Sequence, residues 1–387
     1  MNDDLLGYRG EFPILETTTY LISNSLGAMP RGVYEALKDY ADTLATRGVR
    51  AWQEGWWMLA AEVGNEIGEL LNAPPGSVST HQNVTTCQAV VASCFDFSGK
   101  RNKIVYSDMN FPSVMYFWEA QRPLGAQVQM VASDDGITVP TEQLLDAIDE
   151  TTLLVPVSHV LFRSSYINDA NAIIEKAHQV GAHVVLDTFQ SLGTVPIDVQ
   201  ALSVDFCCGG VLKWLCGGPG VAYLYVRPDL GEKLQPKLTG WSAHQDPFAF
   251  EVGPIRYADP PFRFMNGTPH IPALAAARPG LRMITEIGIQ RIRHKSMRQT
   301  SRLIQLARAR GWRVNTPLDP ERRGGTVSIS MPDSEEVCRE LLKRNVLVDW
   351  RPRAGVRMSP HFYNTDRELD HAVAAVEEIL AHDSLHP

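Results

Sequence analysis

Short apolar runs alternate with amphipathic, helix-like segments between about residue 60 and residue 230. Turn residues bound each run, and the runs have the length of strands. They are KIVYSD at 103–108, QVQMVAS at 127–133, TLLVPVSHV at 152–160, AHVVLDT at 182–188, VDFCCGG at 204–210 and GVAYLYV at 220–226. Segments such as NDANAIIEKAHQVG between them have helical spacing. The alternation predicts an α/β fold whose mainly parallel, doubly wound sheet is covered by helices on both faces.

A second pattern begins after about residue 280. A helical stretch over 284–311 precedes the strand-like runs TVSISMP, VLVDWR and GVRMSP and the helical runs SEEVCRELLKRN and DRELDHAVAAVEEILAH. We expect a large domain (48–280), a smaller C-terminal α/β domain (281–387), and an N-terminal segment (1–47) that packs with the small domain. The stretch from 235 to 272 is rich in Pro, Gly and aromatic residues, and so long a loop is typically functional or an interface.

Composition and charge exclude several classes of partner. Hydrophobic residues make up 44% of the chain and the net charge is −8, without a basic stripe, so no nucleic-acid partner is expected. The N-terminus lacks a signal pattern and no apolar run is long enough to span a bilayer, so we expect a cytoplasmic protein with no membrane partner. The six cysteines are scattered without zinc-ligand spacing, which favours reduced thiols and no metal site.

Lys213 is the leading candidate for chemistry. It lies in GGVLKWLCGGPGVAYLYV, where a strand runs into a turn between large apolar residues and a Gly-rich segment. An apolar setting lowers the pKa of an amine, as attack on an aldehyde requires, and glycines let the backbone approach a bulky ligand. From these residues alone, a lysine that only extends from a strand end to solvent is the alternative.

Asp187 strengthens the case for Lys213. It ends the run AHVVLD, so its carboxylate is expected at the carboxyl edge of a parallel strand, where ligands bind in such sheets. The ring nitrogen of pyridoxal 5'-phosphate (PLP) needs such an anion to stay protonated. A carboxylate that caps the next helix is the alternative. Together, D-x-x-Q followed by K-W-L-x-G-G-P-G indicates a PLP site.

Three further segments fit the same cofactor. A polar cluster with Thr85 opens an apolar helix and could bind a phosphate, although a simple N-cap is the alternative. Phe111 follows a strand and could cover the face of the cofactor, although a lone Phe more often belongs to the core. Arg357 lies in a short apolar strand and suits bidentate capture of a carboxylate, whereas a surface salt bridge is the alternative.

The chain resembles the class V group of fold-type I PLP enzymes, and most of all kynureninase. The resemblance runs from YLISNSLGAMP at 20–30 to the C-terminal helix, and its most specific stretches are FPS at 111–113, LKWLCGGPG at 212–220, GWSAHQDPFAF at 240–250 and GTPHIPAL at 267–274. It implies that the cofactor binds to Val84, Thr85, Phe111, Asp187, Gln190 and Lys213. Lys213 would form the Schiff base, Asp187 would pair with the ring nitrogen, and Gln190 would lie near the phenolic oxygen.

The resemblance also implies a homodimer with its active site at the subunit interface. Trp241 and Thr268 would reach the phosphate from the neighbouring subunit. Arg357 would hold the α-carboxylate of an amino-acid substrate, supported by Asn24. Kynureninases cut the bond beyond Cβ of an aryl-keto amino acid such as kynurenine, with water as co-substrate, and release alanine and an aryl acid.

Three departures concern the reaction rather than the cofactor. Leu212 stands where kynureninases carry Tyr, which removes a plausible general acid. Related class V enzymes often have Ser and His where this chain has Gly210 and Leu212. The kynureninase-like N-Y-R-T-G stretch reads LFRSS at 161–165 and lacks its Asn. We expect a kynureninase-like hydrolase of a β-acyl amino acid, with an aminotransferase or β-eliminating lyase as the alternative and a non-catalytic PLP-binding protein as the third possibility.

Overall fold

The computed structural model describes residues 3–383, so residues 1–2 and 384–387 of the predicted terminal segments lie outside the described residues. The larger domain contains a seven-stranded sheet in the order β2-β8-β7-β6-β5-β3-β4, in which β8 alone runs antiparallel to its neighbours. The strands are β2 (Val78–His81), β3 (Lys103–Ser107), β4 (Gln127–Val131), β5 (Thr152–Ser158), β6 (His183–Asp187), β7 (Phe206–Gly210) and β8 (Ala222–Val226). The predicted mainly parallel sheet is confirmed. Every strand but β2 coincides with a predicted apolar run, and β2 was not predicted because three of the four residues of its sequence VSTH are polar.

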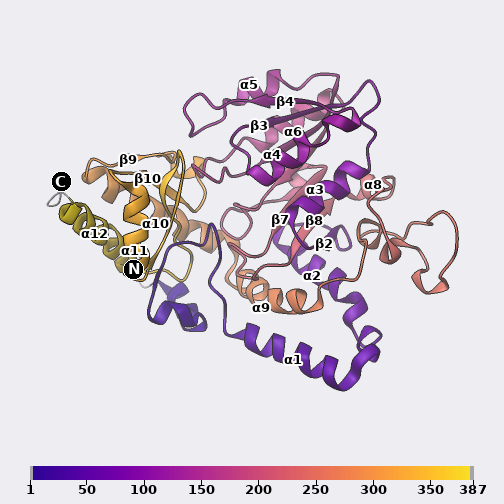
Figure 1. Ribbon diagram of the computed structural model, residues 1–387, viewed down its shortest axis with the longest axis horizontal. Helices are drawn as coiled ribbons and strands as arrows, with labels where there is room; N and C mark the ends of the chain where they lie inside the picture. The colour runs from indigo at the N-terminus through magenta and orange to yellow at the C-terminus, as the bar shows by residue number, and fades with distance from the viewer. Residues whose placement is uncertain (1–2, 384–387) are drawn as a thin grey trace.

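Helices cover both faces of this sheet (Figure 1). They are α2 (Trp56–Leu70), α3 (Val84–Ser93), α4 (Pro112–Glu119), α5 (Thr141–Asp146), α6 (Ala170–Gln179) and α9 (Ile271–Ile287), with the short helices α7 (Val199–Leu202) and α8 (Pro228–Gly231) between strands. Within β6, Val185 packs with the helices α3 and α4, whereas Val184 and Leu186 pack with α2, α6 and α9. Because successive side chains point to opposite covered faces, the strands read as continuous apolar runs.

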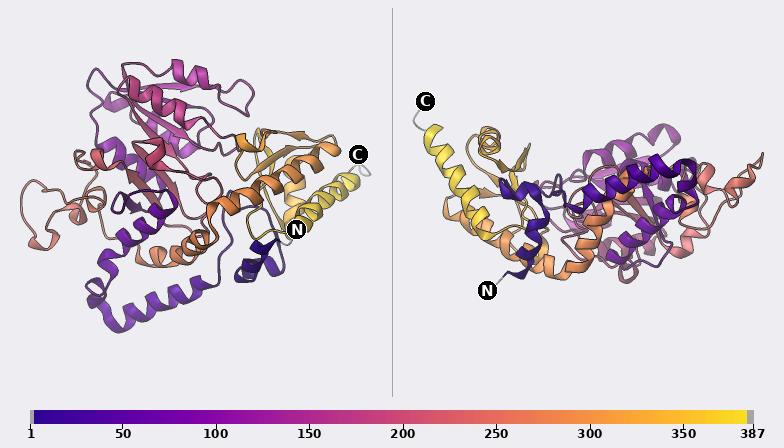
Figure 2. Two further views of the ribbon diagram at one scale, coloured as in Figure 1. Left: turned by 180° about the vertical axis from the view of Figure 1, so that it is seen from behind. Right: turned by 90° about the horizontal axis from the view of Figure 1, so that it is seen from below.

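The smaller domain is a four-stranded antiparallel sheet in the order β12-β13-β10-β9, packed on three helices. Its elements are α10 (Ile289–Ala309), β9 (Arg313–Val314), β10 (Val327–Ser330), α11 (Ser334–Lys343), β12 (Asp349–Arg351), β13 (Gly355–Met358) and α12 (Asp366–Asp383). The N-terminal segment contacts both parts, since β1 (Thr19–Tyr20) pairs with β11 (Val346–Leu347) and α1 (Gly32–Arg47) packs on α9. Figure 2 shows the first part of this segment, before α1, beside the C-terminal elements. No helix among residues 3–383 is long and apolar enough to cross a membrane.

Two predicted elements are interrupted. The helix predicted over 284–311 is two helices, because Gly288 between α9 and α10 has a φ of 84° and its N–H bonds to the carbonyl of Ile284. A positive φ ends a helix, and glycine adopts it without strain. The predicted strand VLVDWR divides into β11 and β12, which belong to different sheets. The stretch from 235 to 270 is the expected long loop, with the 3-10 helices η5 (Trp241–Ala243), η6 (Pro247–Ala249) and η7 (Phe262–Phe264).

Candidate active site

Predicted cofactor residues from four separate segments meet at one edge of the large sheet. Strands β3, β5, β6 and β7 all end at this edge, since they run parallel. Phe111 follows β3, Asp187 ends β6 and Lys213 follows β7. They line a cavity of about 260 Å³. The predicted residues that the structure brings together there are Val84, Thr85, Phe111, Asp187, Gln190 and Lys213.

Lys213 and Asp187 form the ionisable centre of this cavity. Burial lowers the pKa of the Lys213 amine to about 8, although the carboxylate of Asp187 opposes this shift. Burial raises the pKa of Asp187, opposed by the backbone N–H of Phe189, which donates to Asp187 Oδ1 at 2.9 Å, and by the charge of Lys213. The cavity therefore holds an amine that loses its proton more readily than an exposed lysine, near a carboxylate able to pair with a cationic ring nitrogen.

The lowered pKa of Lys213 predicts a pH dependence of cofactor uptake. Only the neutral amine attacks an aldehyde, so the reactive fraction rises as the pH rises through the pKa. We expect the rate of covalent PLP uptake by the apoprotein, followed by stopped-flow absorbance, to rise with pH with a midpoint at about 8. A midpoint near the value of about 10.4 that is ordinary for an exposed lysine would contradict this account.

Helix α3 starts at the wall of the cavity. Asn83 is its N-cap, and Asn83 Oδ1 accepts a hydrogen bond from the backbone N–H of Thr86 at 2.9 Å. Val84 and Thr85 form the first turn and line the cavity. The first N–H groups of a helix have no partner within it and attract anions. This end of α3 therefore suits the phosphate of the cofactor.

Three phenylalanines line the same cavity, and sequence reasoning identified only one of them. Phe111 is 43% exposed, and its ring packs edge-on against Phe162 with the centroids 5.2 Å apart. Phe189 lies within 4.2 Å of the Lys213 amine, measured to the ring centroid. Phe162 lies inside the stretch LFRSS and Phe189 lies inside D-x-x-Q, so a bulky aromatic residue within each stretch was the available signal.

Gln190 and Asn24 join the large domain to the N-terminal segment. Gln190 Nε2 donates to the backbone carbonyl of Asn24 at 2.9 Å, and Gln190 Oε1 accepts from Trp214 Nε1 at 3.1 Å. The Asn24 side chain is buried, and neither its amide nitrogen nor its amide oxygen has a hydrogen-bond partner among the described residues. Leaving a buried amide unpaired is costly, so a polar ligand that pairs with Asn24 would be favoured.

Arg357 is already engaged by a carboxylate of its own domain. On paired positions of β12 and β13, Arg357 Nε and Nη2 donate to Asp349 Oδ1 and Oδ2 at 2.7 and 2.6 Å. Arg357 Nη1 donates across the domain boundary to the carbonyl of Phe162 at 2.6 Å, which places the guanidinium next to the cavity wall. Burial raises the pKa of Asp349, but the hydrogen bonds and the charge of Arg357 outweigh it and hold this pKa below its ordinary value. A substrate carboxylate would therefore meet the Nη1 edge of Arg357, with Asp349 as a positioning residue.

The buried pair predicts a large effect of removing Asp349. Arg357 and Asp349 are 2% and 7% exposed, so Asp349→Ala would leave a buried guanidinium without its counterion. We expect the free energy of unfolding to fall by about 3–5 kcal/mol in urea titrations. The matched control is Asp370→Ala, which removes the partner of Arg302 at the surface and should cost about 1 kcal/mol or less. Equal losses in the two variants would contradict the positioning role.

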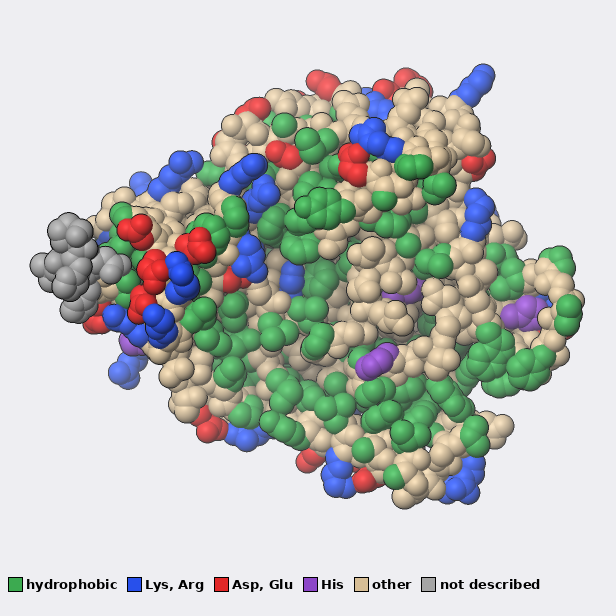
Figure 3. Space-filling view, viewed as in Figure 1, with side chains coloured by type: hydrophobic (Ala, Val, Ile, Leu, Met, Phe, Trp, Pro, Cys, Tyr) green, Lys and Arg blue, Asp and Glu red, His purple; other side chains and the backbone are tan. Residues whose placement is uncertain are grey.

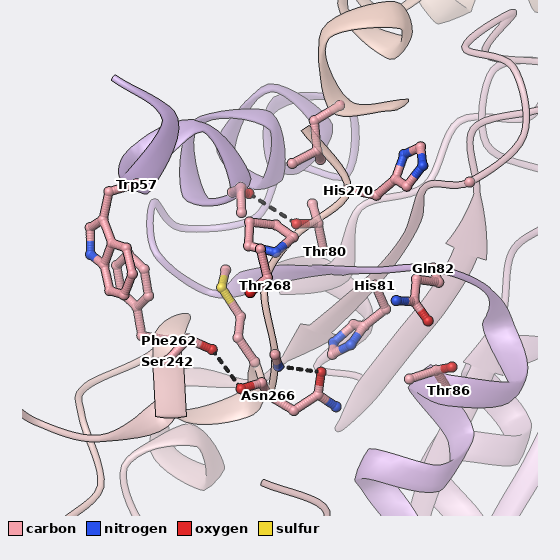
Figure 4. A pocket seen from close by; sticks show the side chains of 16 residues that line it. Trp57, Thr80, His81, Gln82, Thr86, Ser242, Phe262, Asn266, Thr268 and His270 are labelled. Atoms are coloured by element: carbon pink, nitrogen blue, oxygen red, sulfur yellow. Dashed lines mark hydrogen bonds between the residues drawn. The ribbon is translucent and has the colours of Figure 1, made fainter. Parts of the chain in front are cut away.

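Trp241 and Thr268 do not reach the Lys213 cavity of their own chain. Thr268 lines a separate cavity with Thr80, His81 and Thr86 (Figure 4), and Trp241 lies in a neighbouring aromatic groove that Thr268 also lines. The start of α3 borders both the Thr268 cavity and the Lys213 cavity, because Thr86 lines the first and Thr85 lines the second. Within one chain, these two predicted phosphate contacts are therefore outside the cofactor cavity.

The residues present fit PLP. The cavity offers an amine that is readily deprotonated, a buried carboxylate, a helix start for a phosphate and aromatic walls for a flat ring. Lys213 would hold the cofactor covalently, Asp187 would face the ring nitrogen, and Val84 and Thr85 would bind the phosphate. PLP bound there would supply an electron sink for reactions at the α-carbon of an amino acid.

Comparisons with known proteins agree with this geometry. The sequence profile of the family described as aminotransferase class-V matches residues 19–371. An uncharacterized aminotransferase of Bacillus subtilis (strain 168), YcbU, is 35% identical over 376 residues, covering 97% of this chain and 97% of that protein. A kynureninase of Bacillus thuringiensis subsp. konkukian (strain 97-27) is 30% identical over 395 residues, covering 98% of this chain and 92% of that enzyme.

The fold also matches solved structures. The apo cysteine desulfurase of Thermococcus onnurineus NA1 gives a TM-score of 0.87 at 23% identity, covering 97% of this chain and 98% of that one. A mutant of C-DES with glycine covalently linked to its PLP cofactor gives 0.86 at 20% identity, covering 95% and 98%. The predicted fold class and the predicted cofactor are confirmed: this chain belongs to the class V aminotransferase family and is a PLP-dependent enzyme.

Proposed function

We propose that the protein hydrolyses the Cβ–Cγ bond of kynurenine or a related β-acyl amino acid, giving alanine and an acid. The observation that carries this proposal is the aromatic wall beside Lys213. Phe111 and Phe162 pack on each other in the cavity, and the carbonyl of Phe162 binds Arg357. An aryl side chain would find an apolar surface there, while Arg357 holds the α-carboxylate. Similarity to kynureninases over 98% of the chain supports the same assignment.

The residues of this chain have separate roles in that reaction. The Lys213 amine takes the proton from the substrate α-carbon, for which its lowered pKa suits it. Asp187 keeps the ring nitrogen protonated. Asn24, whose amide is unpaired, supports the carboxylate at Arg357. Leu212 cannot donate a proton, so Lys213 or water would protonate Cβ of the fragment that becomes alanine, while the oxygen of the co-substrate water goes to the departing acid.

An aminotransferase is the second candidate, and Leu212 is the observation that favours it. Transamination needs proton transfer by the lysine alone, so it does not require an acidic group at the position of Leu212. The relative that is 35% identical is also named an aminotransferase. A desulfurase-like reaction is disfavoured, because burial raises the pKa of each of the six cysteine thiols, whereas such chemistry needs a reactive thiolate.

The experiment that separates these reactions is a product assay on the holoenzyme. Kynurenine and 3-hydroxykynurenine are each incubated with and without a 2-oxo acid, and alanine and the aryl acid are quantified. The proposal expects alanine together with an equal amount of aryl acid, without any 2-oxo acid. Turnover only in the presence of a 2-oxo acid, or none with either substrate, would contradict it.

We also propose a homodimer in which Trp241 and Thr268 complete the cofactor site of the partner. Both residues lie outside the Lys213 cavity of their own chain. Trp241 is 44% exposed, and the neighbouring Phe248 and Phe250 are more exposed still. Figure 3 shows hydrophobic side chains gathered on this projecting loop. A contiguous exposed aromatic surface of this kind marks a protein interface.

The dimer predicts complementation between two defective variants. We expect Lys213→Ala and Trp241→Ala to be impaired alone, and their mixed dimers to regain part of the activity, because one of the two sites is then intact. Light scattering measures the mass, and the product assay measures the recovery. A monomeric mass, or no recovery after the subunits have exchanged, would contradict shared sites.

A further inference from the structure

Phe189 holds an unusual position in the cofactor cavity. Its ring centroid lies 4.2 Å from the Lys213 amine, and the centroid of Phe111 lies 5.6 Å from the same atom. Both rings line the cavity. The backbone N–H of Phe189 donates to Asp187 Oδ1, so the chain at Phe189 is fixed to the carboxylate that faces the ring nitrogen. The reactive amine is therefore within contact of two aromatic rings from different strands.

Gly210 provides the space that the Phe189 ring fills. A Cβ atom at Gly210 would lie 2.5 Å from Phe189 Cζ and 2.8 Å from Phe189 Cε2, closer than side chains approach one another. The φ of Gly210 is not positive, so the glycine is not needed for backbone conformation. Gly210 ends β7 and Phe189 follows β6, and the two strands are neighbours in the sheet. The ring of Phe189 therefore depends on the absence of a side chain at Gly210.

Two residues that closely precede Lys213 offer no side-chain contact to a phosphate. Gly210 and Leu212 precede Lys213 in sequence and carry no hydroxyl, imidazole or charged group. The polar groups of the cavity that a phosphate could meet include the start of α3 with Thr85 and the hydroxyls of Ser113 and Ser158. An aromatic ring, in contrast, binds a flat heteroaromatic ring through stacking.

We propose that Phe189 is a second cofactor-positioning wall, besides Phe111, that stacks on the PLP ring, and that Gly210 is the residue that makes room for it. The proposal rests on the cofactor assignment above. It implies that stacking on Phe189 and Phe111 contributes to the retention of PLP in addition to the phosphate contacts. Phe189 and Gly210 should therefore be coupled energetically.

The test measures non-covalent binding, so that it does not depend on turnover or on Lys213. Calorimetry gives the Kd of the apoprotein for 4'-deoxypyridoxine 5'-phosphate and for 4'-deoxypyridoxine, which lack the aldehyde and differ only in the phosphate. We expect Phe189→Ala to weaken both ligands by about 10-fold. The matched control, Thr85→Val, should weaken the phosphorylated ligand alone. Phe189→Leu keeps most of the apolar volume, so the fold is retained, and should weaken both ligands by about 3-fold.

A double-mutant cycle tests the coupling to Gly210. Gly210→Ala should weaken both ligands in the wild-type background and have little effect in the Phe189→Ala background, because the clash is then absent. The proposal for Phe189 is overturned if Phe189→Ala and Phe189→Leu leave the affinity for 4'-deoxypyridoxine unchanged, or if Gly210→Ala lowers the affinity equally in both backgrounds. The cofactor assignment stands in either case. If the wild-type protein binds neither ligand, the cofactor site itself is wrong.

Discussion

Lys213→Ala is expected to abolish covalent retention of PLP and to lower turnover by about 10²–10⁴-fold. The amine is the group within the cavity that can bond to the aldehyde, and in the proposed reaction it would also be the base at the substrate α-carbon. The product assay gives the turnover, and the visible absorbance of the dialysed protein gives the retention. Lys103→Met is the control, because Lys103 is another poorly exposed lysine, paired with Asp149 outside the cavity. A Lys213→Ala protein that keeps the same bound chromophore would contradict the assignment.

Asp187→Asn is expected to lower turnover by about 10²–10³-fold while the fold is kept. The amide has the shape of the carboxylate and can still accept the N–H of Phe189, but it cannot stabilise a protonated ring nitrogen. The substitution should also change the pH dependence of cofactor uptake. The Asp187 charge raises the pKa of Lys213, so its loss should shift the midpoint of pH-dependent cofactor uptake below about 8.

The conservative variant Asp187→Glu supplies the control for this prediction. It keeps the negative charge, so the midpoint should stay close to that of the wild type even if the turnover falls. An unchanged midpoint in Asp187→Asn would show that Asp187 does not act on the Lys213 amine. An unchanged turnover would show that Asp187 does not face the cofactor.

The sequence predicts the large sheet well because both of its faces are buried. Strands such as β5 and β6 are apolar between their first and last residues, so they stand out from the amphipathic helices between them. Strand β2 is short and mostly polar, and its pairing with β8 depends on tertiary contacts. The break at Gly288 was not predicted, because a single glycine within an otherwise helical pattern is often tolerated.

The candidate site also contains some residues that local patterns predict and others that depend on tertiary structure. Lys213, Asp187 and Thr85 follow from rules about strand ends and helix starts, and the structure brings them to one cavity. The pairing of Arg357 with Asp349 requires the register of β12 on β13, which no local pattern specifies. The position of the Phe189 ring depends on the space left by Gly210, which is adjacent in the structure and distant in sequence. Such pairs become visible only when the strands are placed side by side.

The central claim, that Lys213 carries the cofactor in a class V PLP enzyme, has one direct measurement. The wild-type holoenzyme is reduced with borohydride and digested, and the peptide that carries the pyridoxyl group is identified by mass spectrometry. The account predicts a single modified peptide that contains GGVLKWLCGGPG, with the group on Lys213. Modification of a different lysine, or a cofactor that dialyses away after reduction, would contradict it.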